Sequence, residues 1–213
     1  KMHWIGSLEK DDMLLFIRTD SPFKSIKDVI KAKEAPKCGT TGVGGSDYVM
    51  SRILEETIGA KINQVLGYNG SSEIALAVAR GEVACQGLTI STFFGREPFL
   101  TWIKTEFVRF LVQTARQRNP KIAEVPTIFE LMDQHRTPDA KRRLATVYLG
   151  AGGFGAWPIV SSPGLPADRV KILREAYAKM VKEPELLEEA KKKGWEIKPV
   201  SGEELEALAK EVI

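Results

Sequence analysis

Short apolar runs alternate with segments of helical periodicity along the first half of the chain. Met13 to Arg18 is an apolar run with the length of a buried strand. A strand, loop and helix that repeat in this order are typical of a doubly wound, mainly parallel sheet with helices on both faces. Further strands are expected at residues 36–41, 62–66, 83–88, 107–115, 157–160 and 195–200. Helices are expected at residues 25–32, 46–58, 71–80, 127–135, 167–182 and 184–193, with a last one starting near residue 201.

Several helix ends carry residues that favour a boundary. Ser46 is expected to cap the helix that begins there, and Gly59 to end it. Thr127 followed by Glu130 has the spacing of a capping box. The residues after position 88 are expected to begin a loop. Helix 167–182 is predicted to bury one face, formed by Val170, Leu173, Tyr177 and Val181.

Two consecutive strand-to-helix turns are rich in glycine and hydroxyl side chains. The first runs from Gly39 to Ser46, and the second from Tyr68 to Ser72. Glycines let a backbone approach a ligand closely, and a helix N-terminus with free N–H groups favours an anion. The first turn alone is equally consistent with an ordinary tight connection, and the second turn alone is a weaker indication of binding. Together they suggest two loops that converge on one carboxylate-bearing ligand.

Composition narrows the possible functions. The net charge is +3 in 213 residues, and no basic block suggests a nucleic-acid partner. Cys38 and Cys85 are expected to be buried and reduced, because neighbouring parallel strands rarely give good disulfide geometry. His3 and His135 lie far apart, so no histidine-based zinc site is expected. No cofactor is expected.

Enzyme motifs are incomplete. Residues 44–48 (GGSDY) lack the closing glycine of a nucleophile elbow. Residues 150–155 match G-x-G-x-x-G, but a strand with Pro158 is expected next instead of the helix that a dinucleotide site requires. No catalytic residue is assigned.

Several segments, in order along nearly the whole chain, resemble the solute receptors of tripartite tricarboxylate transporters, also called the Bug family. They are residues 4–7 (WIGS), 20–25 (DSPFKS), 41–46 (TGVGGS), 67–72 (GYNGSS), 81–83 (GEV), 125–127 (VPT), 158–160 (PIV) and 162–167 (SPGLPA). The chain differs from the family pattern at Asn69, where lysine is usual, and at residues 84–89, where an acid is usual.

The resemblance implies a type II periplasmic-binding-protein fold with one complete lobe and part of the other. Residues 1–19 would be a hinge strand and remnant of lobe 1, residues 20–153 the complete lobe 2, and residues 154–213 a returning hinge strand with the last helices of lobe 1. The first part of lobe 1 is expected upstream of Lys1. The family pattern assigns ligand binding to Thr41, Gly42, Ser46, Tyr68, Gly70 and Ser71.

The function implied by the resemblance is capture of a small organic carboxylate outside the inner membrane and its delivery to the permease subunits of the transporter. Such a protein is periplasmic or extracytoplasmic and is not an enzyme. One alternative is the effector domain of a transcription regulator, which shares the fold and binds small acids. An enzyme on the same fold is the second alternative, which no paired acids or nucleophile–base pair support.

Overall fold

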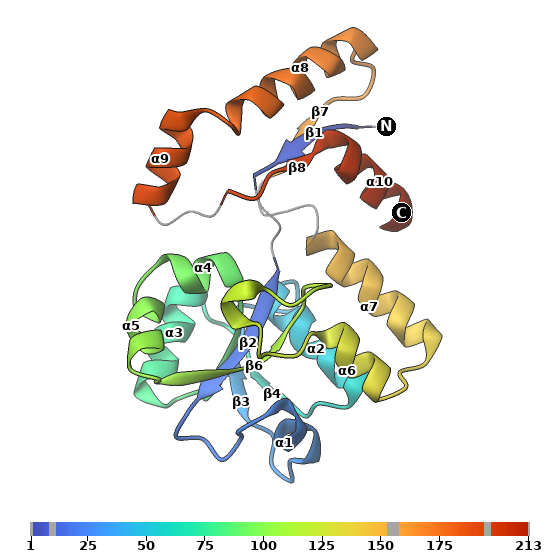
Figure 1. The fold of residues 1–213 in the computed structure, drawn as a ribbon. Helices are drawn as coiled ribbons and strands as arrows, with labels where there is room; N and C mark the ends of the chain where they lie inside the picture. Colours follow the sequence, from blue (N-terminus) through green and yellow to red (C-terminus); the bar gives the residue numbers. More distant parts are fainter. Residues whose placement is uncertain (1, 9–11, 153–157, 194–196, 213) are drawn as a thin grey trace. The chain divides into compact units, whose positions relative to one another are not determined.

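The computed structural model describes residues 2–8, 12–152, 158–193 and 197–212, which belong to two compact units (Figure 1). The central unit is Asp12–Ala145, and the terminal unit combines Lys1–Asp11 with Thr146–Ile213. This division differs from the boundary expected at residue 20, because strand β2 (Met13–Arg18) is hydrogen-bonded within the sheet of the central unit.

The central unit is built on a five-stranded sheet with the order β4-β3-β5-β2-β6. Strand β3 runs parallel to both β4 and β5, whereas β2 runs antiparallel to β5 and β6. Four of the five strands therefore share one direction, and the prediction of a mainly parallel sheet is confirmed. The strands are β2, β3 (Lys37–Gly39), β4 (Asn63–Val65), β5 (Cys85–Thr89) and β6 (Val108–Gln113).

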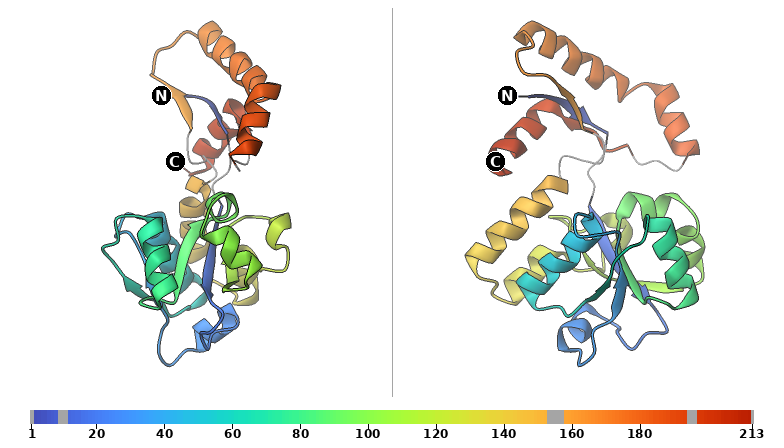
Figure 2. Two further views of the ribbon diagram at one scale, coloured as in Figure 1. Left: turned by 90° about the vertical axis from the view of Figure 1, so that its left-hand side faces the viewer. Right: turned by 180° about the vertical axis from the view of Figure 1, so that it is seen from behind.

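Helices cover both faces of this sheet. Figures 1 and 2 show α3, α4 and α5 on one face, and α2 with α6 on the other. The helices of the central unit are α1 (Ile26–Lys31), α2 (Ser46–Ile58), α3 (Ser71–Arg80), α4 (Ile90–Gly95), α5 (Phe99–Lys104) and α6 (Ile128–Gln134), with a 3-10 turn at Pro120–Ile122. Helix α7 (Asp139–Gly152) begins in this unit and continues beyond its last residue, Ala145. The prediction of a loop after residue 88 is wrong, since Thr89 caps α4 and its side chain accepts a hydrogen bond from the N–H of Thr92.

Aromatic side chains hold α4 and α5 against the sheet. Phe16 of β2, Phe93 of α4 and Phe99 of α5 are all fully buried. The Phe16 ring centroid lies 5.2 Å from that of Phe93 and 6.1 Å from that of Phe99, within the range of favourable aromatic pairs. These contacts fix the position of α4, and with it the residues that follow its last turn.

Most helix boundaries agree with the sequence signals. Gly59 follows α2 with a φ of 71°, the left-handed conformation that favours glycine. The capping box is confirmed, because the Glu130 N–H donates to Thr127 Oγ1 (3.1 Å) and the Thr127 N–H donates to Glu130 Oε2 (3.0 Å). The cap assigned to Ser46 is wrong: Gly45 has the extended backbone of an N-cap, and Ser46 is the first helical residue of α2.

Cys38 and Cys85 form a disulfide between the adjacent parallel strands β3 and β5. Both residues are buried as expected, but the expectation that they are reduced is wrong. The two residues lie directly opposite each other in the strand register, which brings their Cα atoms to 4.4 Å. This separation falls at the short end of the range that a disulfide can span.

The terminal unit has a three-stranded antiparallel sheet with the order β7-β1-β8. Tyr177 packs on Gly6 of the middle strand so closely that a Cβ at Gly6 would lie 2.3 Å from the ring. The Tyr177 hydroxyl donates to the Ser7 carbonyl. The elements are β1 (His3–Ser7), β7 (Ile159–Ser161), β8 (Val200–Ser201), α8 (Ala167–Met180), α9 (Pro184–Lys192) and α10 (Gly202–Val212).

The inward face of α8 is narrower than the sequence indicates. Val170, Tyr177 and Val181 are buried, but Leu173 is 41% exposed, so its inward assignment is wrong. Leu173 lies about 60° around the helix from Val170, at 100° per residue, toward the edge of the buried stripe. Trp157 and Trp195, expected to begin strands, lie outside the described residues; β7 and β8 begin at Ile159 and Val200. No helix in the described ranges is long and apolar enough to cross a membrane.

Candidate functional site

Strands β3 and β5 are parallel neighbours, yet the helices that follow them lie on opposite faces of the sheet. Helix α2 follows β3, and α4 follows β5 (Figure 1). In open α/β sheets, ligands bind beyond the carboxyl ends of the strands at such a switch in topology. The turns that follow β3, β4 and β5 are therefore the candidate site.

Asp47 organises the glycine-rich turn after β3. Its buried carboxylate accepts hydrogen bonds from the Thr41 N–H (2.9 Å), the Thr41 hydroxyl (3.1 Å) and the Tyr48 N–H (2.8 Å). The turn is thereby folded back onto the first turn of α2. This role of Asp47 was not predicted from the sequence, although an acid in the first turn of a helix is the available signal.

The hydrogen bonds to Asp47 give the expected site residues of this turn different roles. The Thr41 hydroxyl is engaged inside the turn, so its role is to hold the loop in shape. Ser46 is exposed as the first residue of α2, and its side chain has no partner within the described ranges. The first N–H groups of a helix have no intrahelical acceptor, so Ser46 and the start of α2 are the part of this turn open to a ligand.

The glycines of this turn differ in the space that a side chain would find around them. A Cβ at Gly45 would lie 2.3 Å from Thr41 Oγ1 and 2.4 Å from Asp47 Oδ1, so a side chain there would disrupt the contact between them. At Gly42 and Gly44 a Cβ would meet nothing within 4 Å. Gly45 is therefore required by packing, whereas Gly42 and Gly44 leave the backbone open.

The second turn leads from β4 into α3 and is tied to the first by the Thr40 N–H, which donates to the Val65 carbonyl (2.9 Å). Tyr68 packs over β3, since its Cε2 lies 3.2 Å from the position of a Cβ at Gly39. Burial, with smaller contributions from the nearby charges of Glu82 and Glu73, raises the pKa of the Tyr68 phenol. Its hydroxyl therefore stays protonated and able to donate through the physiological pH range.

Helix α3 begins with Gly70 as its N-cap and Ser71 as its first residue. The Ser71 hydroxyl accepts a hydrogen bond from Arg96 Nη2 (2.7 Å), and the amide Nε2 of Gln86 lies 3.5 Å from the Ser71 carbonyl. Arg96 was not predicted from the sequence, because it follows α4, a helix of only six residues that was not expected. Gln86 was not predicted either, because it lies within an otherwise apolar strand sequence.

The structure thus places the two groups of expected residues at the carboxyl ends of adjacent strands. Thr41, Gly42 and Ser46 lie at the start of α2, on one face of the sheet. Tyr68, Gly70 and Ser71 lie at the start of α3, on the other face. The expectation that both groups contact one ligand stays a prediction.

The described part of the G-x-G-x-x-G motif does not have the geometry of a dinucleotide site. Gly150 and Gly152 lie within helix α7, and Gly153 and Gly155 fall outside the described residues. A dinucleotide site needs these glycines in a strand-to-helix turn. Over the part of the chain that is described, no group of three or more His, Cys, Asp or Glu residues is arranged to hold a metal ion.

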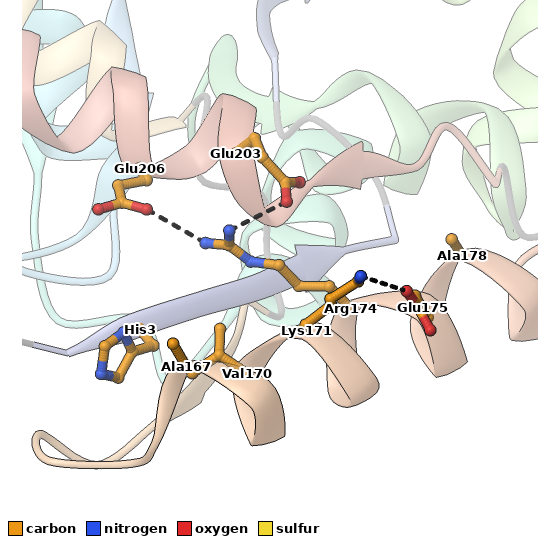
Figure 3. A pocket seen from close by; sticks show the side chains of 9 residues that line it. All are labelled: His3, Ala167, Val170, Lys171, Arg174, Glu175, Ala178, Glu203 and Glu206. Atoms are coloured by element: carbon orange, nitrogen blue, oxygen red, sulfur yellow. Dashed lines mark hydrogen bonds and ion pairs between the residues drawn. The ribbon is translucent and has the colours of Figure 1, made fainter.

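A pocket of about 670 Å³ lies in the terminal unit, between α8 and α10 (Figure 3). Its central cation, Arg174, donates to the Trp4 carbonyl (2.9 Å), Glu203 (2.9 Å) and Glu206 (3.2 Å). The guanidinium therefore ties α8 to β1 and α10, and its charge is compensated. We assign this cluster a structural role.

A family model described as "Tripartite tricarboxylate transporter family receptor" (TctC) matches residues 1–213. The chain belongs to this family. No match was found among curated protein sequences.

Several solved structures have a fold similar to that of this chain. A TctC solute-binding protein from Polaromonas, without ligand, is 19% identical, with a TM-score of 0.72. The periplasmic binding protein BugD is 18% identical (TM-score 0.61), and MatC from Rhodopseudomonas palustris, with bound malate, is 17% identical (TM-score 0.63). Each comparison covers 99% of this chain, but only 66%, 66% and 67% of the respective relatives. At these identities the likeness shows the fold, a periplasmic-binding-protein type, and this chain spans about two thirds of the length of each relative.

Proposed function

We propose that this TctC-family chain forms the ligand-binding part of an extracytoplasmic receptor that captures a small organic carboxylate and delivers it to the membrane subunits of a tripartite tricarboxylate transporter. The central unit would be one complete lobe, and the terminal unit the closing part of the other. The receptor would act by binding alone, without catalysis.

The observation that carries the proposal is the pairing of two glycine-rich turns at the carboxyl ends of β3 and β4. Each turn opens directly into a helix of ten or more residues, α2 and α3. The first N–H groups of a helix and its positive dipole end favour a carboxylate. The exposed Ser46 and the Ser71 hydroxyl add donors beside these helix ends. Malate, the ligand named for one solved relative, is a carboxylate of this kind.

The Cys38–Cys85 disulfide supports an extracytoplasmic location independently of the family. Disulfides persist in oxidising compartments such as the periplasm and are rare in the cytosol. This observation also disfavours the alternative of a transcription regulator's effector domain, which would work in a reducing compartment.

Calorimetric titration of the full-length gene product with malate, succinate, citrate and a neutral sugar tests the proposal. We expect at least one carboxylate to bind and the sugar to give no heat. A charge-assisted hydrogen bond contributes about 1.5–3 kcal/mol, so Ser46→Ala and Ser71→Ala should each weaken binding roughly tenfold or more. Ser72→Ala is the matched control, because Ser72 is exposed and adjacent to Ser71. Binding of the sugar and of no carboxylate would refute the proposed ligand class.

A further inference from the structure

Strand β6 is an outer strand of the central sheet, and part of its outer edge has no backbone partner. On its inner side, the Phe107 carbonyl accepts a hydrogen bond from the N–H of Thr19, the residue after β2 (3.0 Å). Every second residue of an antiparallel strand bonds to the neighbouring strand, so Arg109 also faces β2. Val108 and Phe110 therefore direct their N–H and C=O groups away from β2, and these groups have no partner within the described ranges.

The outer edge of β6 is covered only toward its carboxyl end. There the Gln113 N–H donates to the Pro126 carbonyl (3.0 Å), and Gln113 forms an isolated parallel bridge with Thr127. Beside residues 108–111 lies a pocket of about 650 Å³ instead, within the size range of ligand sites. We call it the β6 groove; its lining is formed by residues 24–27, 108–111, 124–126, Leu131 and Gln134.

The β6 groove carries positive charge that is not compensated. Arg109 donates from Nη2 to one backbone carbonyl (2.9 Å), and its Nε is buried without an acceptor among the described residues. Lys24 and Lys27 are exposed, and in the part of the chain that the structure describes neither forms an ion pair. Glu124 is the only acid among the described lining residues. The nearby Asp28 caps α1, where its carboxylate accepts from the Lys24 N–H (2.9 Å). A partly buried guanidinium without an acid beside it is unfavourable, so the groove favours an anionic occupant.

The open edge and the uncompensated charge together match an extended segment with acidic side chains. A strand added beside β6 would pair its backbone with Val108 and Phe110. Its side chains would alternate between the two faces of the sheet, so that every second one lies on the face of Arg109. A second copy of β6 is a poor occupant, because it would bring the same cations against each other, and cations on an edge strand discourage self-pairing.

We propose that the β6 groove binds an extended acidic segment of a partner protein, which adds to the sheet as a further strand. Its backbone would pair with Val108 and Phe110, and its carboxylates with Arg109 and the two lysines. In the sheet order, β5 and β2 separate β6 from β3, so the groove is distinct from the turns that follow β3 and β4. The inference is therefore independent of the proposed carboxylate site.

The test uses a fluorescently labelled peptide of six residues in which valine and glutamate alternate. Its binding to the full-length gene product is measured by fluorescence anisotropy. One control peptide has lysine in place of glutamate. The other keeps glutamate but has every backbone nitrogen methylated, so that it keeps the charges and cannot donate backbone hydrogen bonds.

The protein variants are Arg109→Gln, the double variant Lys24→Gln/Lys27→Gln, and Lys33→Gln. Lys33→Gln is the matched control, because Lys33 is an exposed lysine that follows α1 and does not line the groove. Melting curves without peptide establish that each variant is folded. Sedimentation velocity measures whether the wild type associates with itself.

We expect the wild type to bind the glutamate peptide, and Arg109→Gln to weaken this binding about tenfold through the loss of a charge-assisted hydrogen bond. The double lysine variant should weaken it about fivefold, because exposed ion pairs contribute less, and Lys33→Gln should behave like wild type. Both control peptides should bind at least about tenfold more weakly than the glutamate peptide.

Three results would overturn the inference. The first is a glutamate peptide that does not bind the wild type, or that binds folded Arg109→Gln equally well. The second is equal affinity for the methylated peptide, which would show recognition of an anion without strand addition. The third is a dimer of the wild type that the peptide dissociates, which would assign this edge to a second copy of the chain. None of these results bears on the titration with small carboxylates.

Discussion

The backbone N–H and the hydroxyl of Thr41 both donate to the carboxylate of Asp47, at 2.9 and 3.1 Å. This pair closes the glycine-rich turn onto the first turn of α2. The exposed start of α2, which would face a ligand, therefore depends on a buried acid that itself points into the turn.

Asp47→Ala should destabilise the central unit, because the Thr41 and Tyr48 donors lose their acceptor. Hydrogen bonds to a charged group contribute about 1.5–3 kcal/mol each, with partial recovery by water. We expect a loss of about 2 kcal/mol, or about 4–8 °C in melting temperature for a chain of this size. Calorimetric melting measures the loss, and Ser46→Ala, at an exposed position of the same turn, serves as the control with little change. An unchanged melting temperature for Asp47→Ala would show that the turn keeps its shape without this acid.

Gly45→Ala and Gly44→Ala should differ sharply although the two residues are neighbours. The new Cβ at position 45 would overlap Thr41 Oγ1 and Asp47 Oδ1, whereas at position 44 it would meet nothing within 4 Å. Overpacking of this kind costs about 1–3 kcal/mol, and a substitution into open space about 0.5 kcal/mol or less. Urea unfolding of the two variants measures both changes. Equal midpoints for the two variants would contradict the close packing around Gly45.

The central unit shows which features could be predicted from the sequence and which could not. The apolar run of β2 and the left-handed glycine after α2 have local signals, and both were predicted correctly. Arg96 reaches Ser71 only because α4 and α5 are held by the aromatic cluster of Phe16, Phe93 and Phe99. Contacts of this kind depend on tertiary packing, and two six-residue helices are too short to show an amphipathic period.

The disulfide is a second feature that local sequence patterns could not predict. Its formation depends on the register of β3 against β5, which places Cys38 directly opposite Cys85. Register between strands 47 residues apart in sequence has no local signal. The general rarity of disulfides between parallel neighbours was therefore a poor guide to this pair.

Removal of the disulfide should destabilise the protein, since it closes a long loop in the unfolded chain. For a sequence separation of 47 residues, the expected loss is about 2–4 kcal/mol. Dithiothreitol should lower the melting temperature of the wild type, and the double variant Cys38→Ala/Cys85→Ala should melt low with or without the reductant. Thiol titration of the denatured, unreduced protein should find no free thiol. Two titratable thiols would show that the bond does not form.

Tyr68 gives the site a dependence on alkaline pH. Burial raises its pKa above the usual value of about 10, and burial likewise raises the pKa of Tyr177. Because the neutral phenol is favoured in the folded state, its contribution to stability is complete below about pH 10. That contribution is lost as the pH rises through the raised pKa.

Absorbance at 295 nm should show two tyrosines that ionise late. Tyr68→Phe should remove one of these transitions and Tyr177→Phe the other. Urea unfolding between pH 9 and 11.5 should show a weaker fall in stability for Tyr68→Phe than for wild type. If both late transitions remain in Tyr68→Phe, the Tyr68 phenol is not buried against Gly39, which would contradict the packing described for this turn.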